Sequence, residues 1–137
     1  MILRIRAGSG LLRITATGKF SLKEAKRTFL EILDAVSQHK TEKIIFDGRE
    51  LKGEPERIER FFYGEFASHA VASYRERGVV RYPQFAYVLQ EPVLDPQRFG
   101  ESVAVNRGMW VQAFDNLDDA LGWLGLAPVS KPDVVDA

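Results

Sequence analysis

The sequence contains no cysteine, which excludes disulfide bonds, thiol nucleophiles, thiolate metal sites and iron–sulfur clusters. Its two histidines, His39 and His69, lack the neighbouring His, Asp or Glu residues at the spacing that a metal site needs. The chain has no net charge, because 19 Lys and Arg residues balance 19 Asp and Glu residues. A neutral balance gives no support to binding of nucleic acid. We therefore expect no metal, no cofactor and no nucleic-acid partner.

Long hydrophobic runs are also missing, since no uncharged apolar stretch approaches the ~20 residues of a membrane span. Residues 1–6 alternate apolar and basic side chains, a pattern typical of a strand and not of a signal peptide. These absences predict a cytoplasmic protein without a membrane span. The length of 137 residues and the hydrophobic content of 45% suit one domain with a real core.

The sequence does contain a short apolar run that opens with a lysine and closes with an acid, at residues 43–47. A continuous apolar run bounded by turn residues predicts a strand that is buried on both faces. Asp47 would then lie at the carboxyl end of a central strand, where open α/β sheets place their sites. Leu51 and Gly53 are expected in the loop that follows.

Hydrophobic periodicity and turn residues on both sides of this run predict the remaining elements. The expected strands are 2–6, 11–17, 43–47, 84–89 and 109–114. The expected helices are 22–40, 56–77, 96–107 and 117–124, with helix-start signals at Ser21, Pro55, Asp95 and Asn116. The expected inward stripe of the long helix is Ile58, Phe61, Phe62, Phe66, Ala70 and Tyr74.

The resulting order is β-β-α-β-α-β-α-β-α. Strands that alternate with helices predict a sheet that is parallel through its middle, and the opening hairpin makes the sheet mixed. We predict an α/β fold with a mixed, mostly parallel five-stranded sheet and about four helices. This domain would span residues 1–126. Residues 127–137 contain two prolines and no periodicity, which predicts a disordered tail.

Two short motifs carry a resemblance to a known family. Residues 44–53 read Ile-Ile-Phe-Asp-Gly-Arg-Glu-Leu-Lys-Gly, a strand followed by Asp, a nearby Arg, an apolar residue and Gly. Residues 105–108 read Val-Asn-Arg-Gly and precede Asp-Ala-Leu-Gly-Trp-Leu at 119–124. With the order of elements, these motifs resemble the STAS fold in its SpoIIAA-like branch, which is related to bacterial anti-sigma-factor antagonists.

The resemblance implies a non-enzymatic protein–protein interaction module of bacterial regulation. Antagonists of the family carry a phosphorylatable serine in an Asp-Ser-Ser-Gly segment at the start of the helix after the central strand. Here residues 52–55 read Lys-Gly-Glu-Pro, so the usual serine is absent. The sheet order also resembles SEC14-like lipid-binding folds. The alternative function is therefore binding of an apolar small molecule or lipid between the long helix and the sheet.

The expected binding residues are Asp47, Arg49, Leu51, Gly53, Phe62 and Phe66. Asp47 is either a general base or ligand anchor, or a turn carboxylate that accepts amides from Arg49 or Glu50, which we favour. Arg49 either binds an anionic ligand or partner carboxylate, or pairs with Asp47 or Glu50. We name no catalytic residue, because the sequence shows no nucleophile with a paired base.

Residues 61–66 contain four aromatic side chains within six positions, which cover more than one face of a helix. One face belongs to the core. The rest either lines an apolar pocket, forms a homodimer patch, or simply fills the space above a small sheet. We therefore expect a protein partner or a homodimer, with an apolar small ligand as the alternative.

Overall fold

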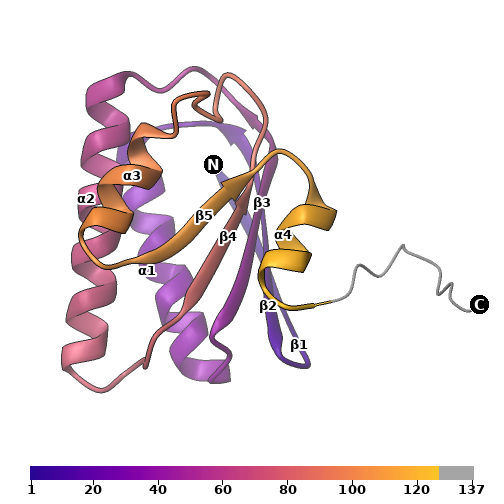
Figure 1. The fold of residues 1–137 in the computed structure, drawn as a ribbon, viewed down its shortest axis with the longest axis vertical. Helices are drawn as coiled ribbons and strands as arrows, with labels where there is room; N and C mark the ends of the chain where they lie inside the picture. Colours follow the sequence, from indigo (N-terminus) through magenta and orange to yellow (C-terminus); the bar gives the residue numbers. More distant parts are fainter. Residues whose placement is uncertain (127–137) are drawn as a thin grey trace, which may run out of the picture.

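The computed structural model, which describes residues 1–126, has the predicted order of strands and helices (Figure 1). The strands are β1 (Ile2–Gly8), β2 (Leu11–Lys19), β3 (Lys43–Lys52), β4 (Gln84–Val88) and β5 (Trp110–Phe114). The helices are α1 (Leu22–His39), α2 (Arg57–Glu76), α3 (Phe99–Asn106) and α4 (Leu117–Trp123). The tail predicted at 127–137 lies outside the described residues.

The five strands form one sheet in the order β1-β2-β3-β4-β5. β1 and β2 pair antiparallel, whereas each later strand pairs parallel to its neighbour. The predicted mixed, mostly parallel sheet is therefore confirmed. β3 is the central strand, and Ile44, Ile45 and Phe46 are 5% exposed or less, so the apolar run is buried on both faces.

β3 is longer than the sequence predicts. The expected strand ended at Asp47, but pairing with β2 continues to Lys52, so Leu51 lies in a strand and not in a loop. The register shifts between Thr15 and Thr17 of β2, because one extra residue of β3 forms a bulge after Asp47. β4 ends opposite Asp47, where Val88 is its partner. Asp47 therefore marks the end of the β3–β4 ladder only.

Some helix starts also differ from expectation. The hydroxyl of Ser21 accepts the amide of Glu24 and caps α1 as predicted, but the Glu24 carboxylate pairs with the N-terminal amine of Met1. Pro55 precedes the α2 cap and does not lie within the first turn. α3 begins at Phe99, later than predicted, because Asp95 accepts the Phe99 amide at 2.9 Å across an irregular turn.

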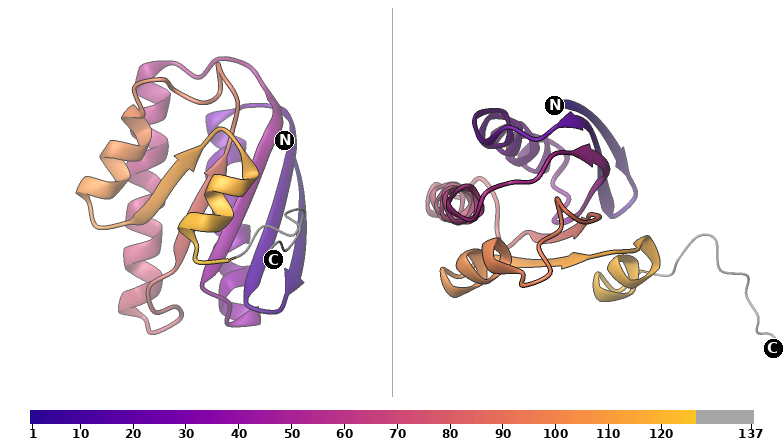
Figure 2. Two further views of the ribbon diagram at one scale, coloured as in Figure 1. Left: turned by 45° about the vertical axis from the view of Figure 1, so that its right-hand side comes forward. Right: turned by 90° about the horizontal axis from the view of Figure 1, so that it is seen from above.

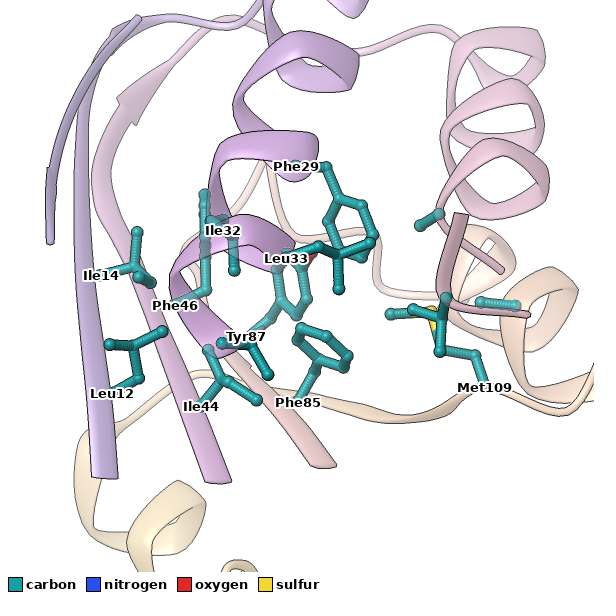
Figure 3. Packing of buried hydrophobic residues seen from close by; sticks show 14 of the residues in the cluster. Leu12, Ile14, Phe29, Ile32, Leu33, Ile44, Phe46, Phe85, Tyr87 and Met109 are labelled. Carbon is teal, nitrogen blue, oxygen red and sulfur yellow. The ribbon is translucent and has the colours of Figure 1, made fainter. Parts of the chain in front are cut away.

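The two faces of the sheet are covered unequally (Figure 2). The α1–α3 helices cover one face, where side chains from the sheet meet those of α1 in the larger core cluster (Figure 3). α4 alone covers part of the other face, where Ile45 and Val88 pack against Ala120, Leu121 and Leu124. No helix among residues 1–126 combines the length and the apolar character needed to cross a bilayer.

Part of the predicted inward stripe of α2 is confirmed, since Phe66, Ala70 and Tyr74 pack against the larger core cluster, whereas two other members are exposed. Ile58 is 53% exposed and Phe62 is 41% exposed. The buried residues of α2 are Gly64, Ala67, Ser68 and Val71. Small side chains are needed there because α2 touches α3: a Cβ on Gly64 would lie 2.6 Å from the carbonyl oxygen of Gly100. Ile58 and Phe62 therefore lie on the exposed side of the helix.

This contact predicts opposite outcomes for alanine at two helical glycines. Gly64→Ala must separate α2 from α3 and should lower the free energy of unfolding by roughly 1–3 kcal/mol. Gly122→Ala in α4 meets nothing within 4 Å and should raise it by about 0.5 kcal/mol through lower chain entropy. Chemical denaturation of both variants is the measurement. Equal effects at the two positions would contradict the backbone contact.

Candidate functional site

Asp47 and Arg49 form a closed ion pair on β3. Asp47 Oδ1 accepts hydrogen bonds from the backbone N–H of Arg49 at 3.2 Å and from its Nε at 3.0 Å. Asp47 Oδ2 accepts a hydrogen bond from Arg49 Nη2 at 2.8 Å. The side-chain hydrogen bond from Arg49 is the main cause that lowers the pKa of Asp47 below its ordinary value. Asp47 is therefore an ionised carboxylate whose oxygens are engaged, which makes it a weak base.

Asp47 points to the α4 side of the sheet. It is paired with Val88 of β4, which packs in the core cluster under α4, and paired residues of adjacent strands share a face. Phe62 and Phe66 lie on α2, across the sheet from that face. The structure therefore does not bring the Asp47–Arg49 pair together with the aromatic residues of α2.

Leu51 and Gly53 lie on the side of the sheet that faces α1–α3. Leu51 follows the bulge and packs against the larger core cluster. Gly53 has a φ of 106°, a left-handed conformation that favours glycine, and it ends β3 beside Phe20. These two residues position the chain at the entrance to α2.

Phe62 and Phe66 lie between α2 and α1 and are covered by a cation. Lys26 Nζ of α1 lies 6.0 Å from the Phe62 ring centre and 5.5 Å from that of Phe66. Phe61 faces the other side, where the Arg107 guanidinium lies 5.5 Å from its ring centre. Tyr63 reaches Tyr87 of β4, and Phe66 also packs against the larger core cluster.

An apolar cavity of about 140 Å³ lies between the sheet and the α1–α3 helices. Its lining includes Ala25 and Thr28 of α1, Gly64 and Ala67 of α2, and Ala104 of α3. Small residues on three helices thus leave the space that larger side chains would fill. The sheet side of the lining is contributed by Phe46, Leu51, Tyr87, Val111 and Ala113.

Two tyrosines meet within this lining. The hydroxyls of Tyr63 and Tyr87 are 2.7 Å apart, a hydrogen-bond distance at which either oxygen is the donor. Burial raises the pKa of Tyr63 to about 12, and burial raises the pKa of Tyr87 well above its ordinary value. Both hydroxyls therefore stay protonated at neutral pH. The contact joins side chains of α2 and β4 across the cavity.

Four charged side chains also line the cavity, and each is engaged by the protein. Arg60 donates from Nη1 to the carbonyl of Val93 and from Nη2 to that of Pro92, both at 2.8 Å. Arg98 donates to the carbonyl of Ala113 and lies 3.6 Å from Glu101. The fourth, Asp95, accepts the amides of Gln97 and Phe99.

A polar surface hollow of about 290 Å³ adjoins the cavity. Pro55, Arg60 and Asp95 line both, so the two spaces meet at the carboxyl end of the parallel strands. Among residues 1–126, no group of three or more His, Cys, Asp or Glu side chains is placed to hold a metal ion. The arrangement offers an apolar binding space, with no visible set of reacting groups among the described residues.

Sequence reasoning missed most of the cavity. Of the predicted site residues, only Leu51 lines it. Tyr63 was placed in the aromatic cluster, but its partner Tyr87 is 24 residues away, beyond the reach of any local pattern. Gly64 did carry a signal, because a glycine within a long helical pattern often marks close packing.

The ion pair of β3 predicts a pKa change that NMR can measure. Arg49→Ala should raise the pKa of Asp47, because the guanidinium hydrogen bond is the main cause of its lowering. A lowered pKa stabilises the fold above the unfolded-state pKa, and this contribution is lost as the pH falls through the folded-state pKa. As the pH falls through the acid range, the Arg49→Ala variant should therefore lose less stability than the wild-type chain does. Arg13→Ala, which removes only a weaker charge effect, should raise the pKa less.

Comparison with known proteins gives the fold. No family model and no curated protein matches the sequence. A solved structure of an anti-sigma factor antagonist from Mycobacterium paratuberculosis is similar over 90% of this chain and 93% of that chain, with a TM-score of 0.56 and 14% identity. The five-stranded mixed sheet with its helices is therefore the STAS-like fold that the two sequence motifs predict.

Proposed function

We propose that this chain is a non-enzymatic protein–protein interaction module of bacterial regulation. The fold supports this proposal, because the similar solved structure is that of an anti-sigma factor antagonist, a description that implies a protein partner. The engaged state of Asp47 agrees with it, since a paired carboxylate of lowered pKa is poorly suited to general base catalysis.

The partner would contact the exposed edge of α2 next to α1, which carries the α2 patch of Ile58 and Phe62. These residues are 53% and 41% exposed and lie one helical turn apart, so their side chains share a face. Exposed aromatic side chains beside a cation, here Lys26, are typical of the residues that contribute most to protein interfaces. This exposed pair is the observation on which the proposal depends.

The α2 patch would act without the phosphorylation that controls antagonists of the family. Residues 52–60, which lead into α2 and form its first turn, contain no Ser, Thr or Tyr. The amide of Glu56 is instead bound by the carboxylate of Glu59 at 2.9 Å. A phosphate next to two acidic side chains would be repelled, so control at this helix start would need another mechanism.

Truncation of the α2 patch should weaken partner binding without unfolding the domain. A partner is first captured from cells with the wild-type chain, identified and purified, and its Kd is measured by calorimetry. Phe62→Ala should raise the Kd by at least about tenfold, the effect of a hot-spot residue. Ile2→Ala, which truncates an apolar side chain 73% exposed on the other side of the sheet, is the control and should leave the Kd unchanged. If Arg49→Ala loses binding and Phe62→Ala binds fully, the assignment of the partner to the α2 patch is wrong.

A second candidate function, binding of an apolar small molecule or lipid between α2 and the sheet, is supported by the cavity. The cavity of about 140 Å³ is comparable to the engineered apolar cavity of about 150 Å³ that binds benzene. Its position, at the carboxyl ends of parallel strands, is where open α/β sheets usually bind ligands.

Filling the cavity should abolish retention of such a molecule. Native mass spectrometry of protein from cells should show an added mass on the wild-type chain. Ala67→Leu extends a side chain from α2 into the cavity and should remove that mass. Ala70→Leu, one turn along the same helix but outside the cavity lining, is the matched control and should retain it. Bare protein in all samples would contradict this function.

A further inference from the structure

The Tyr63–Tyr87 pair leaves one hydrogen-bond donor without a partner. Each hydroxyl carries one O–H, and a single hydrogen bond between them uses only one of the two. Whichever oxygen donates, the other keeps its own proton. Among residues 1–126, neither oxygen has another hydrogen-bond partner. Tyr87 is only 8% exposed and Tyr63 is partly buried, so the free donor is buried if Tyr87 keeps its proton and partly buried if Tyr63 does.

Aromatic rings pack on both members of the pair, and among residues 1–126 no acceptor besides the partner hydroxyl lies at hydrogen-bond distance from either oxygen. The Phe29 ring meets Tyr63 edge-on at 6.1 Å between ring centres, and the Phe46 ring stacks on Tyr87 at 4.7 Å. A buried donor without a partner costs free energy, and native structures rarely keep one. Because both tyrosines line the cavity, a ligand held there is placed to supply the acceptor.

The charges around the cavity argue against an ionic ligand. Its lining holds two arginines and two acids, which balance. Arg60 donates to two backbone carbonyls and Arg98 donates to a third, so both guanidinium groups are engaged within the protein. An anion would lose its water without gaining a free cation, which is costly in an apolar space.

We propose that the cavity binds a neutral, mainly apolar molecule of about the size of an aromatic ring, whose single polar oxygen accepts the free O–H of the Tyr63–Tyr87 pair. This inference rests on the proposed ligand-binding function and gives it a ligand class.

The test uses two probes of nearly the same shape. Acetophenone carries a carbonyl oxygen where α-methylstyrene carries a methylene group, and the Kd of each is measured by NMR titration of the full chain. The double variant Tyr63→Phe/Tyr87→Phe removes both hydroxyls together, so no buried hydroxyl is left alone and the fold should be kept. The ratio of the two Kd values should shift by roughly tenfold toward α-methylstyrene in the double variant.

The outcomes separate this inference from the function on which it rests. If α-methylstyrene binds and the Kd ratio is the same in both proteins, the cavity binds ligands and the tyrosine assignment is wrong. If neither probe binds the wild-type chain, the ligand-binding function itself is contradicted. Benzoate is the charged control, and binding tighter than that of acetophenone would overturn the neutral ligand class.

A second measurement keeps the test valid if the double variant does not fold. Tyrosine labelled with ¹³C at Cζ reports on the hydroxyl of each of the four tyrosines in the unmutated chain. Acetophenone should shift the Cζ signals of Tyr63 and Tyr87, whereas α-methylstyrene at equal occupancy should shift them far less. Equal shifts with the two probes would overturn the inference.

Discussion

The contact between Gly64 of α2 and the backbone of α3 at Gly100 determines how the helices cover the sheet. The two helices approach so closely that a single Cβ on Gly64 would lie 2.6 Å from a carbonyl oxygen. Helices in such contact present small residues to each other, and here Ala67 and Ala104 also lie beside the contact in the lining of the cavity. Short side chains cannot fill the space above the sheet, so the cavity follows from the helix contact.

The central strand divides the molecule into two sides with different roles. Up to the bulge, successive side chains of β3 point to opposite faces of the sheet. Phe46 therefore joins the core under α1–α3, and Ile45 packs under α4. Asp47 continues the α4 side, and there Arg49 binds both of its carboxylate oxygens. The most polar feature of the central strand is therefore internally satisfied. The two features proposed to bind, the α2 patch and the cavity, lie on the other side of the sheet.

The order of the elements could be predicted because its signals are local. The caps at Ser21 and Asn116 are short-range contacts that sequence spacing specifies, and both form as expected. The end of β3 could not be predicted in this way, since Arg49 and Glu50 have the composition of a loop. They belong to the strand because β2, much earlier in the chain, pairs with them through a bulge.

The candidate site was less predictable than the fold, for a related reason. Helical spacing predicted that Phe62 points inward. Where α2 approaches α3, however, the buried positions of α2 hold small residues. The tyrosine pair joins α2 to β4. Periodicity describes one helix or strand at a time, so it could not predict this contact. A helical pattern fixes which residues share a face, and only tertiary packing decides which face is buried.

The two proposed functions use opposite sides of one helix, which connects them physically. Phe62 and Tyr63 are neighbours in α2, and adjacent helical residues point apart, so one side chain meets a partner and the other meets a ligand. Tyr63 lines the cavity and Phe62 is exposed, and both are attached to consecutive backbone positions of α2. Any effect of the ligand on partner affinity must then be matched by an equal effect of the partner on ligand affinity. If both proposals hold, α2 is the element through which a small molecule in the cavity and a protein on the α2 patch would affect each other.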